Sequence, residues 1–433
     1  FFDNLTMQAI FQPIIGQTSG ILYCHQCPDN EINDWLVQEN MARHSAPPDL
    51  FHADGMNAAI MAVEAIKATE GDMSAAALIP AMEGMEFEGP KGTVYIRPED
   101  HVAIQDMYIV KLLNLNDPEF KFYEVMGTTR PEPPCLLPEG MTDRCGDLPV
   151  GSLAEMPAEP EPEPPAGGLT CDEPIKIGLI SDLTGGLSIY GTMLEQSFML
   201  GMEHFAGAPG TDDGVFMVDD CEVQILIRDD QGSAETTATL ARELLEVDEV
   251  DLLVGTVSSG STATLQEIAL ENDIVLIVAP AAANDITGIN FNDHTFRTSR
   301  ENYQDSINLC EYLAEQYETF VQIAPDYSFG YGGAQAFRDA CTYFGGEFIA
   351  DDIFAPLDTA DFTPYMEQIL ASGAEAWIVT WAGGGFVPMF QAAQELGVLD
   401  SLGLGASFFD NLTMQAIFQP IIGQTSGILY CHQ

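Results

Sequence analysis

Two serines and a glycine stand where the sequence changes from a strand pattern to a helix pattern. Ser258, Ser259 and Gly260 follow the apolar run DLLVGTV and open a stretch, TLQEIALEN, that is typical of a helix. The first N–H groups of a helix have no partner within it and lie at the positive end of its dipole. They therefore suit a carboxylate or amide oxygen. The alternative is that a serine here only caps the helix and meets no ligand.

A second strand end carries three alanines. Ala281, Ala282 and Ala283 follow the run IVLIVAP and could offer backbone groups to the same ligand. Trp381 stands at a further strand end, two residues before a run of three glycines. Glycines allow the backbone to approach a ligand closely. No GK[ST] follows them, so this segment is not a phosphate loop.

Three aromatic residues lie close to expected strand ends. Tyr190 follows a Gly-rich loop, and Tyr327 and Phe329 belong to the stretch DYSFG. Such side chains could form the walls of a ligand pocket. Packing in the core or between lobes is an equally good reading of all three.

The cysteines predict disulfides and an oxidising compartment. The chain has nine, and Cys24 recurs as Cys431 in a repeated segment, which leaves an even number of distinct cysteines. Their places beside expected strands, helices and loops pair Cys171 with Cys221, Cys310 with Cys341, and Cys135 with Cys145. Cys24 and Cys27 form a CxxC. A structural disulfide is favoured there over a redox pair or half a zinc site, because no second CxxC or matching histidine pair exists.

Catalytic motifs are missing from the sequence. Neither GxSxG, HExxH nor a GxGxxG in its required context occurs, and the seven histidines are scattered. Pairs of carboxylates carry no information in so acidic a chain. We therefore expect a protein that is not an enzyme and has no cofactor.

The charge balance excludes several partners. Asp and Glu number 67 against 14 Lys and Arg, which gives a formal charge of −53. Such a surface repels nucleic acids and anionic lipid headgroups, whereas divalent cations can bind to it. No apolar run approaches the roughly 20 residues of a membrane span, so we expect no membrane insertion. The chain starts at Phe1 with no signal peptide, which predicts a processed or windowed product.

The elements that position these residues form two series. IKIGLISD (175–182) begins a regular alternation of strands and helices, and a second series starts near Arg297. Among the expected helices are 194–206 and 51–69, and EFIADDIF is expected as one strand. Strands alternating with helices of this length imply parallel sheets, so the fold class is α/β with two doubly wound lobes.

One segment occurs twice. Residues 1–26 are identical to residues 408–433, and the Pro/Glu-rich residues 131–171 form an expected linker. The chain reads smoothly only when 27–130 follows 433. The sequence thus predicts an N-lobe over 172–297, a C-lobe over 298–433 that includes the duplicated helix and crossover strand, and a segment 27–130 that completes both lobes.

In this rotated order the chain resembles the type I extracytoplasmic solute-binding proteins of ABC importers, in the branched-chain amino acid and amide group. The resemblance covers nearly everything except the linker. Its landmarks are IKIGLISDLTGGLSIYG, VDLLVGTVSSGSTATLQEIALENDIVLIVAPAAANDITG, HTFRTSRENYQDS, PDYSFGYGGAQAFRDACTYFGGE, TADFTPYMEQILASGAEAWIV and FEGPKGTVYIRPEDH. The family has two α/β lobes that are joined by three crossover strands and close around a small ligand. The chain is offset from the family order like a circular permutation.

The resemblance implies that Ser259 is the side-chain donor to the ligand. Amino acid binders usually carry Thr or Ser where Ala283 stands, and an acidic residue for the ammonium near Pro388 and Met389. Both features are missing, which argues against an ordinary α-amino acid. We expect an extracellular, cell-surface or periplasmic protein that binds a small polar solute of the amino acid or amide class, with an importer permease as its partner.

The duplicated segment leaves two alternatives open. One copy could dock into a neighbouring molecule, which would make the protein a subunit of a filament or array of identical copies. Such a protein could also have lost ligand binding and be purely structural. The other alternative is a monomeric binding protein in which the repeat is only an overlap of the numbering.

Overall fold

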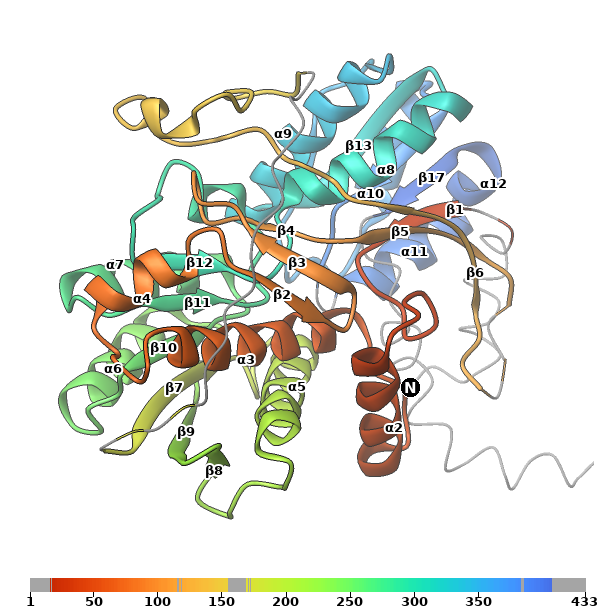
Figure 1. Ribbon diagram of the computed structural model, residues 1–433. Helices are drawn as coiled ribbons and strands as arrows, with labels where there is room; N and C mark the ends of the chain where they lie inside the picture. The colour runs from red at the N-terminus through yellow and green to blue at the C-terminus, as the bar shows by residue number, and fades with distance from the viewer. Residues whose placement is uncertain are drawn as a thin grey trace, which may run out of the picture.

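The computed structural model describes residues 16, 18–114, 117, 119–154, 169, 171, 173–382 and 385–406. They form two α/β lobes, each with a mostly parallel sheet and helices on both faces, and antiparallel strands run between them (Figure 1). The two-lobe, doubly wound architecture that the sequence predicts is confirmed.

The N-lobe sheet has the strand order β12-β11-β10-β7-β9-β8, and its only antiparallel pair is the hairpin of β8 and β9. Its strands are β7 (Ile175–Ser181), β8 (Val215–Val218), β9 (Cys221–Asp229), β10 (Leu252–Gly255), β11 (Leu276–Val278) and β12 (Thr295–Arg297). Side chains alternate between the faces of a strand, so Leu252 and Val254 pack on one side and Leu253 on the other. The first face is covered by α3 (Leu50–Ala68) and α5 (Ser188–Ala206), and the second by α6 (Ala234–Glu246) and α7 (Ser259–Glu271).

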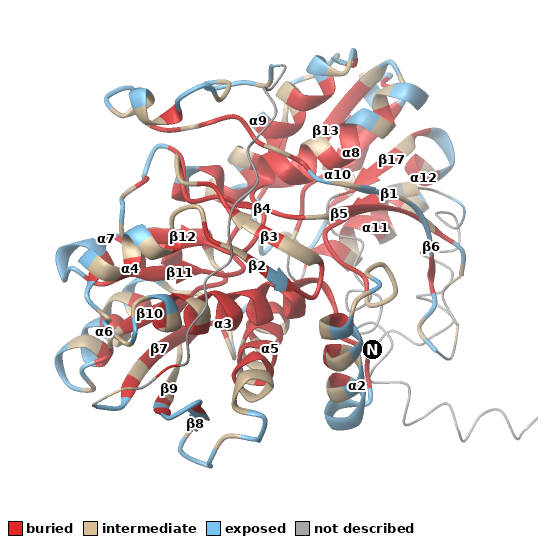
Figure 2. Ribbon diagram, in the orientation of Figure 1, coloured by how far each residue is buried: buried red, intermediate tan, exposed pale blue. Residues whose placement is uncertain are grey.

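The C-lobe sheet is parallel throughout, in the order β14-β13-β16-β17 with β15 also paired to β13. Its elements are β13 (Thr319–Pro325), β14 (Glu347–Phe348), β15 (Ile353–Ala355), β16 (Ala376–Val379), β17 (Gly403–Ala406), α8 (Asn302–Gln316), α9 (Ser328–Tyr343), α10 (Thr363–Ser372), α11 (Phe386–Glu395) and α12 (Val398–Ser401). Phe320 and Ile378 pack against α8 and α9, whereas Val321 and Trp377 pack against α10 and α11. Figure 2 shows that the central strands of both sheets are buried, whereas exposed residues lie in loops, on the outer sides of helices such as α2, and on β6 and β8.

The segment that precedes the expected linker contributes to both lobes. It contains β1 (Thr18–Ile21), α2 (Glu31–His44), α4 (Ala75–Met82), β2 (Glu86–Gly89), β3 (Gly92–Ile96), β4 (Ala103–Ile104), β5 (Met107–Leu112) and β6 (Tyr123–Thr129) besides α3. Strands β1, β5 and β6 form one antiparallel sheet, and β2, β3 and β4 form another. Strand β1 also lies beside β17, so it continues the C-lobe.

Helix α3 is the clearest case of this sharing, because it packs along α5 in the N-lobe. All but three of its 19 residues are buried. The two helices approach closely because glycines face the contact. A Cβ on Gly55 would lie 2.1 Å from Ser197 Oγ, and one on Gly201 would lie 2.6 Å from Ala59 Cβ. Residues far apart in the sequence thus complete one lobe.

The four predicted disulfides are present. They join Cys24 to Cys27, Cys135 to Cys145, Cys171 to Cys221, and Cys310 to Cys341. Cys171 precedes β7 and Cys221 is the first residue of its parallel neighbour β9, so their sulfurs meet at one edge of the sheet.

Three boundaries differ from the prediction. Helix α5 begins at Ser188 rather than at residue 194, since the Gly-rich loop before it leads directly into the helix. The expected strand EFIADDIF is two strands, β14 and β15, separated by polar, partly exposed residues that leave the sheet. Strand β8 was not predicted.

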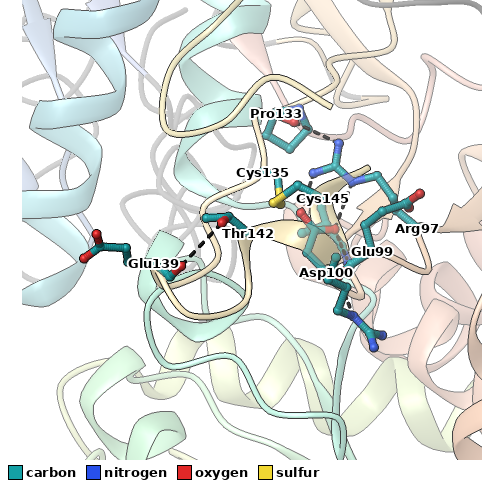
Figure 3. Close-up of a disulfide and its surroundings, with 10 residues drawn as sticks. Arg97, Glu99, Asp100, Pro133, Cys135, Glu139, Thr142 and Cys145 are labelled. Atoms are coloured by element: carbon teal, nitrogen blue, oxygen red, sulfur yellow. Dashed lines mark hydrogen bonds and ion pairs between the residues drawn. A yellow bond between two sulfur atoms is a disulfide. The ribbon is translucent and has the colours of Figure 1, made fainter. Parts of the chain in front are cut away.

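The first half of the expected linker is a folded loop. Residues 131–154 contain the 3-10 helix η2 (Thr142–Cys145) and are closed by the Cys135–Cys145 disulfide. Arg97 Nη1 donates to Pro133 O at 2.8 Å and also pairs with Asp100, which fixes the loop on the N-lobe (Figure 3). This part is not an extended spacer, because a buried arginine and a disulfide hold it. Residues 155–168 lie outside the described residues.

The duplicated segment is described only in its first copy. Residues 18–21 pair with β5 in register Thr18 to Lys111 and Ile21 to Tyr108. The second copy, 408–433, lies outside the described residues, so the prediction for it stays a prediction.

Candidate functional site

A pocket lies between the two lobes, at the carboxyl ends of their parallel strands. The space open to the centre of a water molecule is about 30 Å³, which is room for about two waters. The lining residues come from both lobes and from the segment that joins them: Phe51, Leu187, Tyr190, Val257, Ser259, Pro280, Ala281, Ala282, Arg300, Tyr327, Phe329 and Ala382. A larger solute therefore enters only when the lobes move apart.

The start of α7 provides the serine of this lining. Ser258 is the N-cap, and its side chain accepts a hydrogen bond from Ser261 N at 3.5 Å. Ser259 is the first helical residue and is buried at 5% exposure. Its Oγ accepts a hydrogen bond from Ala283 N at 3.3 Å. The Ser259 hydroxyl can still donate its own proton to a ligand in the pocket.

A buried arginine holds the alanine loop in place. Arg297 Nη1 donates to Ala281 O at 3.1 Å, and Nη2 donates to Ala283 O at 2.7 Å. Ser299 Oγ also donates to Ala281 O. The loop is thus fixed from behind by groups at the end of β12, and its pocket side is rigid.

Aromatic rings form the walls of the pocket. Phe51 and Tyr190 meet edge to face with centroids 5.0 Å apart, and Tyr327 and Phe329 lie at 5.9 Å. Burial raises the pKa of the Tyr327 phenol, so it stays neutral at physiological pH and can donate a hydrogen bond. The first two rings belong to the N-lobe and the other two to the C-lobe.

Arg300 brings a positive charge to the pocket. It lies between β12 and α8 and is 1% exposed. Its Nη1 donates to Pro280 O at 3.2 Å and its Nε to Asp305 Oδ1 at 3.3 Å. The guanidinium carbon is 5.3 Å from the centroid of the Phe51 ring, within the range of a cation–π contact.

Further buried charged groups lie near Arg300, outside the pocket lining. Asp54 of α3 and Lys91 of the β2–β3 turn interact electrostatically with it and with Asp305. Desolvation raises the pKa of Asp54, raises that of Asp305 to about 6, and lowers that of Lys91 to about 8. Lys91 Nζ donates to Leu22 O at 3.3 Å.

The structure brings six of the ten predicted ligand residues into the lining: Tyr190, Ser259, Ala281, Ala282, Tyr327 and Phe329. The others lie elsewhere. Ser258 caps α7, Gly260 is exposed, and the Ala283 N–H is bonded to Ser259. Trp381 is fully buried in the C-lobe core, with its ring 5.2 Å from that of Phe362, so it packs rather than faces the pocket.

Sequence reasoning missed Phe51 and Arg300. Phe51 opens a helix that comes before the expected linker, and nothing local to it indicates a pocket. Arg300 offered a signal, because a cation at the end of a parallel strand is notable in a chain with 14 Lys and Arg against 67 acidic residues.

The described residues contain neither a cluster of metal ligands nor a helix that could span a membrane. No three or more His, Cys, Asp or Glu side chains are grouped so that they could hold a metal ion. In the same part of the chain, no helix combines the length and apolarity that crossing a membrane requires.

A pocket lined from both lobes at the ends of their parallel strands is the arrangement of a two-lobe binding protein. The family model described as periplasmic binding protein matches residues 4–116 and 174–427, so the chain belongs to this family. The extracytoplasmic location that the sequence predicts agrees with it.

Curated relatives include Leu/Ile/Val-binding protein homolog 6 of Brucella melitensis. It is 25% identical over 258 residues, which cover 59% of this chain and 63% of that protein. Leu/Ile/Val-binding protein BraC3 of Rhizobium johnstonii is 23% identical over 211 residues, covering 48% and 54%. The chain thus spans less than two thirds of the length of these relatives.

Solved structures similar to this chain are also binding proteins. A periplasmic binding protein from Burkholderia mallei has a TM-score of 0.49 at 23% identity, covering 55% of this chain and 61% of that one. A branched-chain amino acid transporter protein from Rhodopseudomonas palustris has a TM-score of 0.43 at 28% identity, and the coverage is 54% and 61%. A solute-binding protein from the same species, in complex with 4-hydroxybenzoate, has a TM-score of 0.46 at 22% identity and the same coverage.

Proposed function

We propose that this chain is the solute-binding protein of an ABC-type importer and that it holds one small polar solute between its lobes. The observation that carries the proposal is the pocket formed by Ser259 and the alanine loop on one side and Tyr327 and Phe329 on the other. A solute that touches both sides favours the closed form over the open form, which is the signal a permease could recognise. Membership of the periplasmic binding protein family supports this role.

Ser259 is the residue whose role can be separated from that of its neighbour. We expect Ser259→Ala to weaken solute binding about tenfold, because a hydrogen bond to the ligand is lost. Ser258→Ala is the matched control. It removes the N-cap and should lower the free energy of unfolding by about 1 kcal/mol, while affinity stays within about twofold of the wild type.

The test is a thermal-shift screen followed by calorimetry on the full chain. The panel contains amino acids, amides, urea and small carboxylates, which covers the expected amino acid or amide class and the nearest alternatives. At least one compound should raise the melting temperature in proportion to the logarithm of its concentration. If every compound leaves the melting temperature unchanged, the proposal is wrong.

The duplicated segment supports a second candidate, a filament or array built by segment exchange. Residues 18–21 already occupy the strand position beside β5, so the identical residues 425–428 need a place elsewhere, and a neighbouring copy offers one. Light scattering on the full chain should then show multimers, and deletion of 408–433 should yield monomers. A monomeric full chain would contradict this candidate and leave solute binding unaffected.

A further inference from the structure

We propose that Arg300 selects the ligand: it pairs with the carboxylate of a small solute that has a flat apolar body and no ammonium group. This inference rests on the proposed function, since it assumes that the interlobe pocket binds a solute. It narrows the class of solute from small and polar to monocarboxylate.

The position of Arg300 is the first argument. Among the described residues that line the pocket, Arg300 carries the only charge. It meets the pocket beside Phe51 on one side, and its charge also acts on Tyr327 of the opposite lobe. A carboxylate placed between the lobes would therefore lie against a cation in a site with little water, where charge pairing is strong.

The lining also excludes a positively charged solute. It contains no Asp or Glu in its described part, so an ammonium group would lose its hydration without gaining a counter-charge. It would in addition stand near the Arg300 guanidinium. The same reasoning disfavours a zwitterionic α-amino acid, because its ammonium group is fixed next to its carboxylate.

The buried charged groups next to Arg300 favour the binding of a negative charge. Arg300 and Lys91 are positive, and Asp305 and Asp54 can be negative. Asp54 is fully buried, and neither of its carboxylate oxygens has a hydrogen-bond partner among the described residues. Such a carboxyl is favoured in its protonated form. Burial raises the pKa of Asp54, so this carboxyl offsets less of the positive charge of Arg300 and Lys91 than an exposed one would, which favours a negatively charged ligand.

The aromatic side chains that line the pocket indicate the shape of the uncharged part of the ligand. Phe51, Tyr190, Tyr327 and Phe329 present ring faces and edges from both lobes. A flat apolar group fits between such surfaces and gains the contact energy of stacked or edge-to-face rings. Ser259 remains as a hydrogen-bond donor for the second carboxylate oxygen.

Two matched ligand pairs test the inference by calorimetry on the full chain. Benzoate against benzamide changes the negative charge and keeps the ring. The second pair is phenylacetate against phenylglycine, which adds an ammonium group to the same carbon skeleton and keeps the ring. We expect benzoate to bind at least about tenfold more tightly than benzamide, and phenylacetate at least about tenfold more tightly than phenylglycine. Equal binding within either pair would overturn the inference, and this comparison needs no variant.

Arg300→Gln provides the second readout. It should weaken benzoate about tenfold or more and change benzamide by less than about threefold. Arg338→Gln is the control, because Arg338 is a half-exposed arginine of α9 outside the pocket lining. A merely structural role for Arg300 predicts that both ligands weaken together. Equal weakening of both ligands, or an unchanged preference of Arg300→Gln for benzoate, would overturn the inference and leave the proposed function intact. Failure of every solute in the panel to bind would overturn the proposed function as well.

Discussion

His52 makes the fold sensitive to acid through the first turn of α3. The backbone N–H of Asp49 donates to His52 Nδ1 at 3.0 Å, and the Asp49 side chain in turn bonds backbone N–H groups of the first turn, which completes a capping box. Nδ1 can accept this bond only while it carries no proton. Burial lowers the pKa of His52 from 6.5 to about 4. A protonated Nδ1 can donate only to Asp49 O, 3.2 Å away, so protonation breaks the capping box of the helix that also carries Phe51 into the pocket.

The expected loss of the free energy of unfolding follows from the shift in the pKa of His52. The unfolded chain binds a proton at His52 below pH 6.5, whereas the folded chain does so only below about 4. The resulting stability is complete above pH 6.5 and is lost as the pH falls towards 4. A shift of this size corresponds to about 3 kcal/mol in total, of which about 2 kcal/mol is already lost at pH 5.

Urea unfolding at pH 7.5 and pH 5.0 measures the effect. His52→Gln is the informative variant, because Gln at this position of a capping box can accept the same bond and does not titrate. On acidification the wild type should lose about 2 kcal/mol more than this variant. His294→Gln, at a position outside α3 where the ring lies against Asp273, controls for the loss of a histidine and should keep the acid-dependent loss of the wild type. Parallel losses in wild type and His52→Gln would refute the reasoning.

Two further predictions concern the N-lobe. Replacing Cys171 and Cys221 together by alanine opens a loop whose ends are 50 residues apart. In chemical denaturation the free energy of unfolding should therefore fall by about 4 kcal/mol. An unchanged free energy of unfolding when a reductant is added to the wild type would contradict this prediction. Gly191→Ala places a Cβ 1.7 Å from the carbonyl oxygen of Asp182. We expect the free energy of unfolding to fall by about 2 kcal/mol or more. A melting temperature equal to that of the wild type would contradict this, because it would mean that the backbone near Asp182 moves aside without cost.

Local patterns predicted the elements of the C-lobe most closely. The sequence predicts a helix over NYQDSINLCEYLAEQ (302–316) and a strand over TFVQIAP (319–325), and α8 and β13 have the same bounds. The early start of α5 could not be read in this way, because it depends on packing against α3, which is far away in the chain. Strand β8 pairs with the next strand, β9, in a hairpin, and a run of four residues carries little periodicity.

Part of the candidate site could also be predicted from local patterns. Ser259 and the alanine loop follow strands of one sheet, so their meeting is a consequence of parallel topology. Phe51 reaches the pocket through packing between segments, which no local pattern encodes, whereas Arg300 had a signal as a rare cation near a strand end. Trp381 shows the opposite case, since a large aromatic residue at a strand end is equally suited to a core, and Phe362 holds it there.

The packing of α3 against α5 also has a consequence for synthesis. Helix α3 ends at Ala68 and α5 begins at Ser188, so the ribosome completes the apolar helix well before its partner surface exists. At roughly 5–20 residues per second the delay is on the order of ten seconds. During this time a helix that is later buried on nearly every side is exposed to solvent and to other nascent chains. Residues 50–68 are therefore where we expect a chaperone acting during translation to bind.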